Sequence, residues 1–243
     1  MARFLGRRRP KNFNHVAKYG LIAEAPAVVN KVLTLPYYHK TWDQNGFNAC
    51  VGFGSSMGMA IMNTIDWKAA GRVPYTHRYD PFWLWNETKK IDPWPETNPG
   101  DNEGTSVSYA FDVLLTKGHI RLVNGTRQGP FLGYGVKENR WAESVDDIRA
   151  CIAAGNPVVI GTDWYSGFSN PELINNEYWI GTNGLGAFEG GHCTCIYGAY
   201  DRRLAFRVKN SWLNYPLVWL PYSVMEKLLY DYGEATIVTD REL

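Results

Sequence analysis

The sequence lacks the features that mark several large classes of protein. None of its apolar runs reaches 18 residues, about the length that a membrane-spanning helix needs. Glycine (24 of 243 residues) and proline (13) are too few for a collagenous or low-complexity chain. An excess of one charge is also missing, because 25 lysines and arginines face 24 aspartates and glutamates. Together with a hydrophobic content of 45%, these counts exclude a disordered chain and predict a globular protein.

Cysteine is scarce as well, with four residues in the chain. Cys193 and Cys195 would share one face of a strand, a poor geometry for a disulfide between them. With His192 they offer three metal ligands, but no second CxxC or HxxxH pair completes a usual zinc set. We therefore predict no metal and no cofactor, and we expect Cys151, Cys193 and Cys195 to be buried packing groups.

Positive charge gathers at the start of the chain. The first 20 residues contain no acid and six basic residues, among them Arg7, Arg8 and Arg9. Such an arm could contact nucleic acid, an anionic surface, an assembly partner or the chain's own acidic body, or it could be a solvated terminus. No apolar h-region follows these charges, so we expect no secretory signal and a cytoplasmic or virion-associated protein.

The hydrophobic pattern predicts helices first and strands last. Residues 50–65 are apolar on nearly all sides and indicate a buried helix. Residues 105–118 and 144–154 have the caps and spacing of further helices, and residues 71–103, with Trp83, Trp85 and Trp94, read as a long loop. Short apolar runs then predict strands at 193–200, 205–209, 217–220 and 234–238, with a helix at 222–230.

This order predicts an α+β fold with a helical half and a sheet half. Residues 1–34 are expected to be an N-terminal extension and residues 35–243 one domain. The length suffices for one large domain or for two small lobes around a cleft.

Three chemically reactive residue types stand at distinctive places in this pattern. Cys50 begins the buried helix, and Gln44 precedes it by six residues. His192 opens a predicted strand directly after Gly190 and Gly191. Asn210 follows the next strand, in the run VKNSW. A thiol nucleophile needs a nearby base, and an imidazole needs a group that orients it, so this set indicates nucleophilic catalysis.

The chain resembles the papain-like cysteine peptidases, and more closely their divergent bacterial and phage-encoded branch. Three blocks carry the resemblance: WDQNGFNACVGF, EGGHCTCIYGAYD and FRVKNSW. The Cys-to-His separation of 142 residues fits the spacing of the family, and Asn210, 160 residues after Cys50, lies slightly beyond it. The resemblance covers roughly residues 36–229 and implies a two-lobe fold, with the cysteine in the helical lobe and the histidine and asparagine in the antiparallel sheet lobe.

The resemblance also implies a role for each residue. Cys50 would be the nucleophile, favoured as a thiolate at a helix N-terminus, and His192 would hold its proton. Asn210 would orient the imidazole, and Trp212 would shield that hydrogen bond from water. Gln44 and the backbone N–H of Cys50 would form the oxyanion hole. Gly190 and Gly191 belong to the binding region, and the substrate would be a protein or peptide.

Several departures from the family pattern accompany this resemblance. Leu213 stands where glycine usually follows the Asn-Ser-Trp run, and Asn48 and Ala49 replace Gly-Ser before the nucleophile. The extension is shorter than a usual inhibitory propeptide. We therefore expect no full latency mechanism, although the segment could still lie across the cleft.

Two alternatives to a peptidase remain open at this point. A cell-wall peptidoglycan amidase or endopeptidase would use the same thiol chemistry, and exposed Trp83, Trp85 and Trp94 could then stack on sugars. A phage virion or assembly protein could keep the scaffold for a structural purpose, with Arg7, Arg8 and Arg9 binding an assembly partner.

Overall fold

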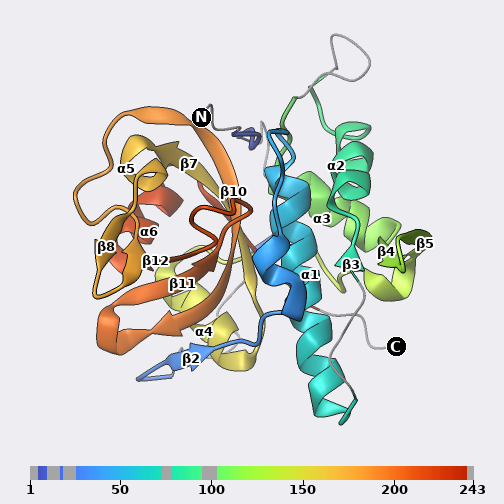
Figure 1. Ribbon diagram of the computed structural model, residues 1–243, viewed down its shortest axis with the longest axis horizontal. Helices are drawn as coiled ribbons and strands as arrows, with labels where there is room; N and C mark the ends of the chain where they lie inside the picture. Colours follow the sequence, from blue (N-terminus) through green and yellow to red (C-terminus); the bar gives the residue numbers. More distant parts are fainter. Residues whose placement is uncertain (1–4, 10–16, 19–25, 73–77, 95–102, 240–243) are drawn as a thin grey trace.

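Two lobes lie side by side in the molecule (Figure 1). The computed structural model describes residues 5–9, 17–18, 26–72, 78–94 and 103–239. Helices predominate in one lobe and an extended sheet in the other, so the predicted α+β architecture, helical lobe first and sheet lobe second, is confirmed. No helix within these residues has the length and apolarity to cross a membrane.

The helical lobe is built around one long helix. Its α-helices are α1 (Cys50–Ala69), α2 (Pro81–Lys89) and α3 (Val107–Thr116). A small antiparallel sheet of β3 (Arg78–Tyr79), β4 (His119–Val123) and β5 (Thr126–Phe131) completes it, with the 3-10 turns η1 (Tyr37–Thr41) and η2 (Leu132–Tyr134).

Helix α1 is buried between the two lobes, as its apolar sequence predicts. Its glycines weaken helix propensity, but they let the sheet lobe approach closely. A Cβ atom at Gly54 would lie 2.6 Å from the sulfur of Cys193, and one at Gly58 would lie 2.9 Å from a methyl group of Val159. The helix therefore gives up local propensity for tight packing against the sheet.

The sheet lobe centres on one long strand, which is paired on both sides. Strand β10 (Phe188–Tyr200) runs antiparallel to β7 (Val158–Tyr165) and to β11 (Ala205–Lys209). The strand order across the sheet is β1-β6-β13-β7-β10-β11-β12-β9-β8. The remaining strands are β1 (Ala17–Lys18), β6 (Arg140–Trp141), β8 (Glu172–Ile174), β9 (Glu177–Trp179), β12 (Leu217–Pro221) and β13 (Glu234–Ile237).

Helices α4 (Val145–Ala154), α5 (Ser166–Ser169) and α6 (Tyr222–Tyr230) and the turn η3 (Asp201–Arg203) belong to this lobe. The predicted capping of α4 is confirmed. The hydroxyl group of Ser144 accepts from the backbone N–H of Asp147, the Asp147 carboxylate accepts from the N–H of Ser144, and Gly155 ends the helix at φ 102°.

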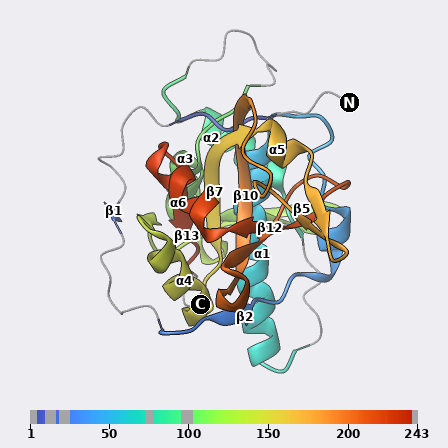
Figure 2. The same ribbon diagram turned by 90° about the vertical axis from the view of Figure 1, so that its left-hand side faces the viewer.

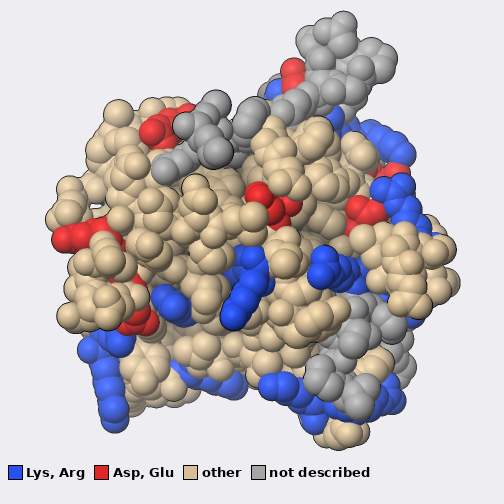
Figure 3. Space-filling view, in the orientation of Figure 1, with Lys and Arg blue, Asp and Glu red and all other residues tan. Residues whose placement is uncertain are grey.

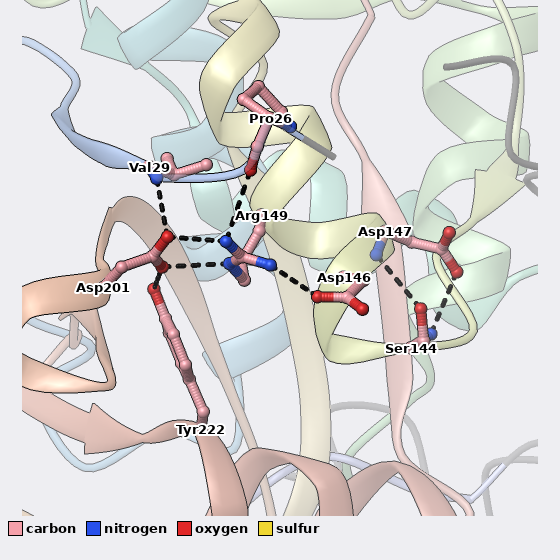
Figure 4. A network of polar contacts seen from close by, with 8 residues as sticks. All are labelled: Pro26, Val29, Ser144, Asp146, Asp147, Arg149, Asp201 and Tyr222. Atoms are coloured by element: carbon pink, nitrogen blue, oxygen red, sulfur yellow. Dashed lines mark hydrogen bonds and ion pairs between the residues drawn. The ribbon is translucent and has the colours of Figure 1, made fainter. Parts of the chain in front are cut away.

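Part of the extension is joined to the sheet lobe. Strand β2 (Asn30–Val32) pairs antiparallel with the end of β10. Asp201 accepts from the backbone N–H of Val29, from the Tyr222 hydroxyl group and from the Nε and NH2 groups on one edge of the Arg149 guanidinium (Figure 4). The NH1 group of Arg149 donates to Asp146. These contacts tie the chain before residue 34 to the helix and sheet behind it.

The prediction of a loop over residues 71–103 is wrong for residues 81–89, which form helix α2. The signal was present at its start. Asp80 caps the helix by accepting from the backbone N–H of Trp83, and Pro81 occupies the first turn, where its missing N–H costs nothing. The tryptophan side chains pack inward. In the sequence alone, they suggested an irregular loop held by aromatic packing, and so they concealed the helical pattern.

Candidate active site

Cys50 is the first residue of α1, at the boundary between the lobes. Its side chain is fully buried. Burial raises the pKa of the thiol to about 11, although hydrogen bonds with the backbone of Gly6, Cys193 and Val51 favour the thiolate. The contact with Cys193 brings the sulfur beside the strand residue that follows His192.

The His192 imidazole is held in one orientation by Asn210. Its Nε2 lies 2.8 Å from Asn210 Oδ1, which also accepts from the backbone N–H of Ser211 at 2.7 Å. Because that second donor identifies the oxygen of the amide, the imidazole Nε2 carries the proton in the neutral ring and Nδ1 is left as the base. Nδ1 is buried and has no hydrogen-bond partner among the described residues.

Two tryptophans enclose this imidazole. The Trp212 ring stacks on it with centroids 4.4 Å apart, and the Trp164 ring meets it edge-on at 4.6 Å. This stacking places Trp212 where the predicted shield of the His192–Asn210 hydrogen bond would lie. Burial lowers the pKa of His192 to about 4, and the Asn210 contact opposes this shift. Trp164 lies near the end of β7, and no motif marks it in the sequence.

Gln44 is fixed by hydrogen bonds to its own loop and to Ser211, the residue after Asn210. Its Oε1 accepts from the hydroxyl group of Ser211 at 2.6 Å, and its Nε2 donates to the carbonyl oxygen of Phe47 at 2.6 Å. Its backbone N–H donates to the carbonyl of Ser211. The structure therefore brings all four predicted catalytic side chains, Cys50, His192, Asn210 and Gln44, to one junction between the lobes.

The arm segment, residues 5–9, passes through this junction (Figure 2). The backbone N–H of Arg7 donates to the carbonyl of Gly191 at 2.9 Å, in the sheet lobe. On the helical side, Thr105 donates to the carbonyl of Gly6 at 2.8 Å and accepts from the N–H of Arg8 at 2.7 Å. The arm segment thus forms a parallel β-bridge with the helical lobe, at Thr105, and a hydrogen bond with the sheet lobe, at Gly191.

Glycines make this close approach possible. A Cβ atom at Gly191 would lie 2.2 Å from the Arg7 carbonyl oxygen, and one at Gly190, where φ is +147°, would lie 3.1 Å from Leu5. On the arm segment itself, a Cβ atom at Gly6 would lie 1.8 Å from the carbonyl oxygen of Asn48. The predicted binding glycines, Gly190 and Gly191, therefore border an extended backbone in the cleft.

All three arginines of the arm segment contact acidic residues of the same chain. Arg7 forms an ion pair with Glu234 and lies near Asp163. Arg8 forms an ion pair with Glu103 at 2.5 Å. The Arg9 guanidinium donates to the Asp163 carboxylate through two nitrogens. Of the partners considered for the basic arm, the structure describes the chain's own acidic body. The face seen in Figure 3 mixes both signs of charge.

The remaining predicted groups have structural positions. All four cysteines are free and buried. Cys193 and Cys195 point toward α1, as alternation in β10 requires, and His192 lies on the opposite face of the strand. These three residues therefore do not converge on one metal ion, and the described part of the chain holds no cluster of three or more metal-ligating side chains.

His119 has no motif around it, and without one a histidine is expected at the surface or in a loop; for His119 this expectation is wrong. His119 is fully buried, and both ring nitrogens are paired, one with Ser56 Oγ and one with the backbone N–H of Ile120, each at 2.8 Å. The sequence around it has no motif because packing alone selects it. His39 is half-buried and bonds to the Pro36 carbonyl, and His15 and His77 lie outside the described residues.

Comparison with solved structures identifies the fold. Xylellain, a cysteine protease from Xylella fastidiosa, superposes with a TM-score of 0.67 at 17% identity, over 98% of this chain and 97% of that one. Procathepsin B S9 from Trypanosoma congolense gives 0.63 at 13% identity over 98% and 86%. Digestive procathepsin L 3 from Tenebrio molitor gives 0.60 at 12% over 95% and 76%.

No protein-family model and no curated protein sequence matches the chain. At these identities the likeness establishes the fold: the chain has the papain-like cysteine protease fold.

Proposed function

We propose that the protein is a thiol hydrolase that cleaves peptide bonds with Cys50, His192, Asn210 and Gln44. One observation carries this proposal. The His192 imidazole is oriented by Asn210 and enclosed by tryptophans, and its Nδ1 is buried with no hydrogen-bond partner among the described residues. The next residue, Cys193, bonds through its backbone to the Cys50 thiol. Leaving a buried ring nitrogen unpaired costs free energy, and a catalytic base is a reason to retain it.

The reaction follows from the tautomer. The Cys50 thiol gives its proton to His192 Nδ1, and the sulfur attacks the peptide carbonyl carbon. Hydrogen bonds from the Gln44 amide and the Cys50 backbone N–H stabilise the oxyanion. His192 then returns its proton to the leaving amine. Water, deprotonated by the same nitrogen, hydrolyses the thioester and restores the thiol.

The state with the arm segment in the cleft is a resting one. A thiol pKa of about 11 and an imidazole pKa of about 4 leave both groups neutral at pH 7. Both shifts arise from burial, so withdrawal of the arm segment would admit water, lower the thiol pKa and raise the imidazole pKa. From the length of the extension we expected no full latency mechanism. In this proposal a short arm nevertheless suffices to cover the nucleophile.

A variant that releases the arm segment tests the function. In Gly6→Ala/Arg7→Met, the arm-released variant, the new Cβ meets the Asn48 carbonyl and the ion pairs of Arg7 are lost. We expect iodoacetamide at pH 6 to modify Cys50 about 100-fold faster than in the unaltered chain, with mass spectrometry locating the label, because the reactive species is the thiolate. Hydrolysis of a casein or peptide-library substrate should appear in parallel.

The control is Cys50→Ala in the arm-released variant, which should hydrolyse nothing. Fast alkylation without hydrolysis of any peptide would refute the peptidase proposal and leave a reactive thiol of another class.

The peptidoglycan alternative loses its supporting feature. Trp85 is buried, and Trp83 and Trp94 are half-buried against His119 and Tyr109. No row of exposed rings is therefore offered to a sugar chain by these three residues. The virion or assembly role, the cytoplasmic or virion location and an assembly partner for the arginines stay predictions from the sequence.

A further inference from the structure

A pocket beside Cys50 is occupied by the side chain of Arg7, which is completely buried. Its Nε lies 3.0 Å from Glu234 Oε2, and its terminal NH2 group donates to the Tyr232 carbonyl at 2.7 Å. The other terminal nitrogen lies 3.7 Å from Asp163 Oδ1. An arginine buried this deeply needs such partners to offset the loss of its hydration.

The body of the protein builds this pocket. Gly161 of β7 lies opposite Glu234 of β13 in the strand register, and alternation puts Asp163 on the same face as Gly161. The missing side chain of Gly161 provides the space, because a Cβ atom there would lie 2.9 Å from Glu234 Oε2 and 3.2 Å from Arg7 Cγ. Val107, at the start of α3, closes the pocket from the helical lobe.

The Glu234 carboxylate is positioned independently of the arm segment. Its Oε1 accepts from the backbone N–H of Ser108 at 3.0 Å, in the first turn of α3. This bond to a helix N-terminus does not depend on Arg7. The floor of the pocket is therefore a buried carboxylate in a fixed position.

The positive charge in the pocket comes from the arm segment alone. Among the described residues, every ion pair of Glu234 and of Asp163 is made by Arg7 or Arg9. When the arm segment withdraws, the body offers two carboxylates, one fully buried, with no cation of its own paired to them. Another cation would then replace the arginine at little cost.

The pocket also has a defined place relative to the nucleophile. Gly6 makes the backbone hydrogen bond with Cys50, and Arg7 is the next residue along the arm segment. The backbone N–H of Arg7 bonds to Gly191, the residue before His192. Consider an extended peptide that takes the place of the arm segment. The residue in the position of Gly6 would lie at the Cys50 sulfur, and the side chain of the neighbouring residue, in the position of Arg7, would enter this pocket.

We propose that the pocket of Glu234, Asp163 and Gly161 is a substrate subsite for a positively charged side chain, arginine or lysine, one residue removed from the bond that is cleaved. This assignment of substrate class rests on the proposed peptidase function. The arm segment covers the site because it presents the side chain that the pocket selects.

The first experiment measures the pocket without catalysis. The peptide acetyl-Leu-Gly-Arg-Arg-Arg-amide copies the arm segment, and a second peptide carries citrulline, neutral and of the same shape, at the position of Arg7. In the arm-released variant, both peptides should protect Cys50 from iodoacetamide. We expect the protecting concentration of the arginine peptide to be about 30-fold or more below that of the citrulline peptide, because the neutral analogue leaves the Glu234 carboxylate without an ion pair.

Adding Glu234→Gln to the arm-released variant should bring the two protecting concentrations within a few-fold of each other. Glu226→Gln, which removes the same charge from an exposed position of α6, should leave the ratio unchanged. Circular dichroism checks the fold of each variant. Equal protection by both peptides before Glu234 is altered would overturn the subsite.

The second experiment separates the subsite from the proposed function. Fluorogenic peptides with arginine, lysine, citrulline or leucine at the position one removed from the scissile bond are offered to the arm-released variant. We expect kcat/KM for arginine to exceed that for citrulline about 100-fold, and lysine to fall between them. Charge-selective protection of Cys50 without cleavage would refute the peptidase and keep the subsite. Cleavage with no preference for a cation would refute the subsite and keep the peptidase.

Discussion

Two buried histidines, one in each lobe, have nearly the same surroundings but different hydrogen bonding. His119 packs against Tyr79 and Trp83, and its pKa is lowered to about 3; His192 packs against two tryptophans, and its pKa is lowered to about 4. Burial is the first cause in both. Neither burial, nor aromatic packing, nor pKa therefore distinguishes His192, the proposed base, from His119.

The difference lies in the second ring nitrogen. In His119 the Nδ1 accepts from the Ile120 N–H, so Nε2 must donate to Ser56, and the ring is satisfied on both sides. In His192 only Nε2 has a partner among the described residues, and Nδ1 is left with its lone pair in a buried place. A basic ring nitrogen with a free lone pair can accept a proton, whereas a hydrogen-bonded one cannot without breaking that bond.

The largest effect that separates the two sites should come from replacing each histidine. In the arm-released variant, His192→Ala should lower kcat/KM for peptide hydrolysis by about 1,000-fold or more, because the base is removed. His119→Gln should leave kcat/KM within a few-fold and lower the free energy of unfolding by roughly 1–3 kcal/mol through unsatisfied partners. Steady-state kinetics and urea unfolding of both variants provide the measurements. Comparable losses of activity would show that the comparison has no functional meaning.

An intermediate effect should come from the partner of each ring. Asn210→Ala in the arm-released variant should lower kcat about 10- to 100-fold with little change in KM, since the imidazole loses its orientation but the peptide still binds. Ser56→Ala should leave kcat unchanged and cost about 1–2 kcal/mol of stability, because Nε2–H of His119 is left unpaired. A kcat that falls as far in Ser56→Ala as in Asn210→Ala would contradict this division of roles.

The smallest effect concerns pH and should be the same for both histidines. Each folded-state pKa lies below the ordinary value of 6.5, so the unfolded chain binds more protons below pH 6.5 and stability falls as the pH decreases. Between pH 6.5 and 4.5 each ring should contribute a loss of about 2 kcal/mol. Urea unfolding of the unaltered chain against His119→Gln measures one contribution. A slope unchanged by the substitution would mean that His119 does not titrate in this range.

The candidate site was largely readable from the sequence because its residues stand next to strong local signals. Cys50 begins an apolar helix, His192 follows two glycines at the start of a strand, and Asn210 ends the next strand. Most predicted elements are confirmed within a few residues, and the 3.6-residue and two-residue periodicities explain why. The missed helix α2 has its capping signal at Asp80 and Pro81, but tryptophans on its faces concealed the pattern.

Other features depend on residues that meet only in the folded chain. Glu234 begins the strand β13, and Asp163 lies near the end of β7; nothing in either local pattern indicates that they face one pocket. Strand pairing of β7 with β13 brings them together, and the start of α3 fixes one of them. Arg7 lies between these two carboxylates, and each of them is more than 150 positions from it in the sequence.

The sequence by itself determined the element order, the α+β class and the choice of candidate catalytic side chains, because local periodicity, caps and turn residues act between neighbours in the chain. Only the tertiary structure decided that both ring nitrogens of His119 are hydrogen-bonded while His192 Nδ1 has no partner among the described residues, and that the basic arm segment lies between the lobes. Burial, ion pairing and the second hydrogen bond of a ring depend on the contacts between lobes, and no local pattern in the chain encodes those contacts.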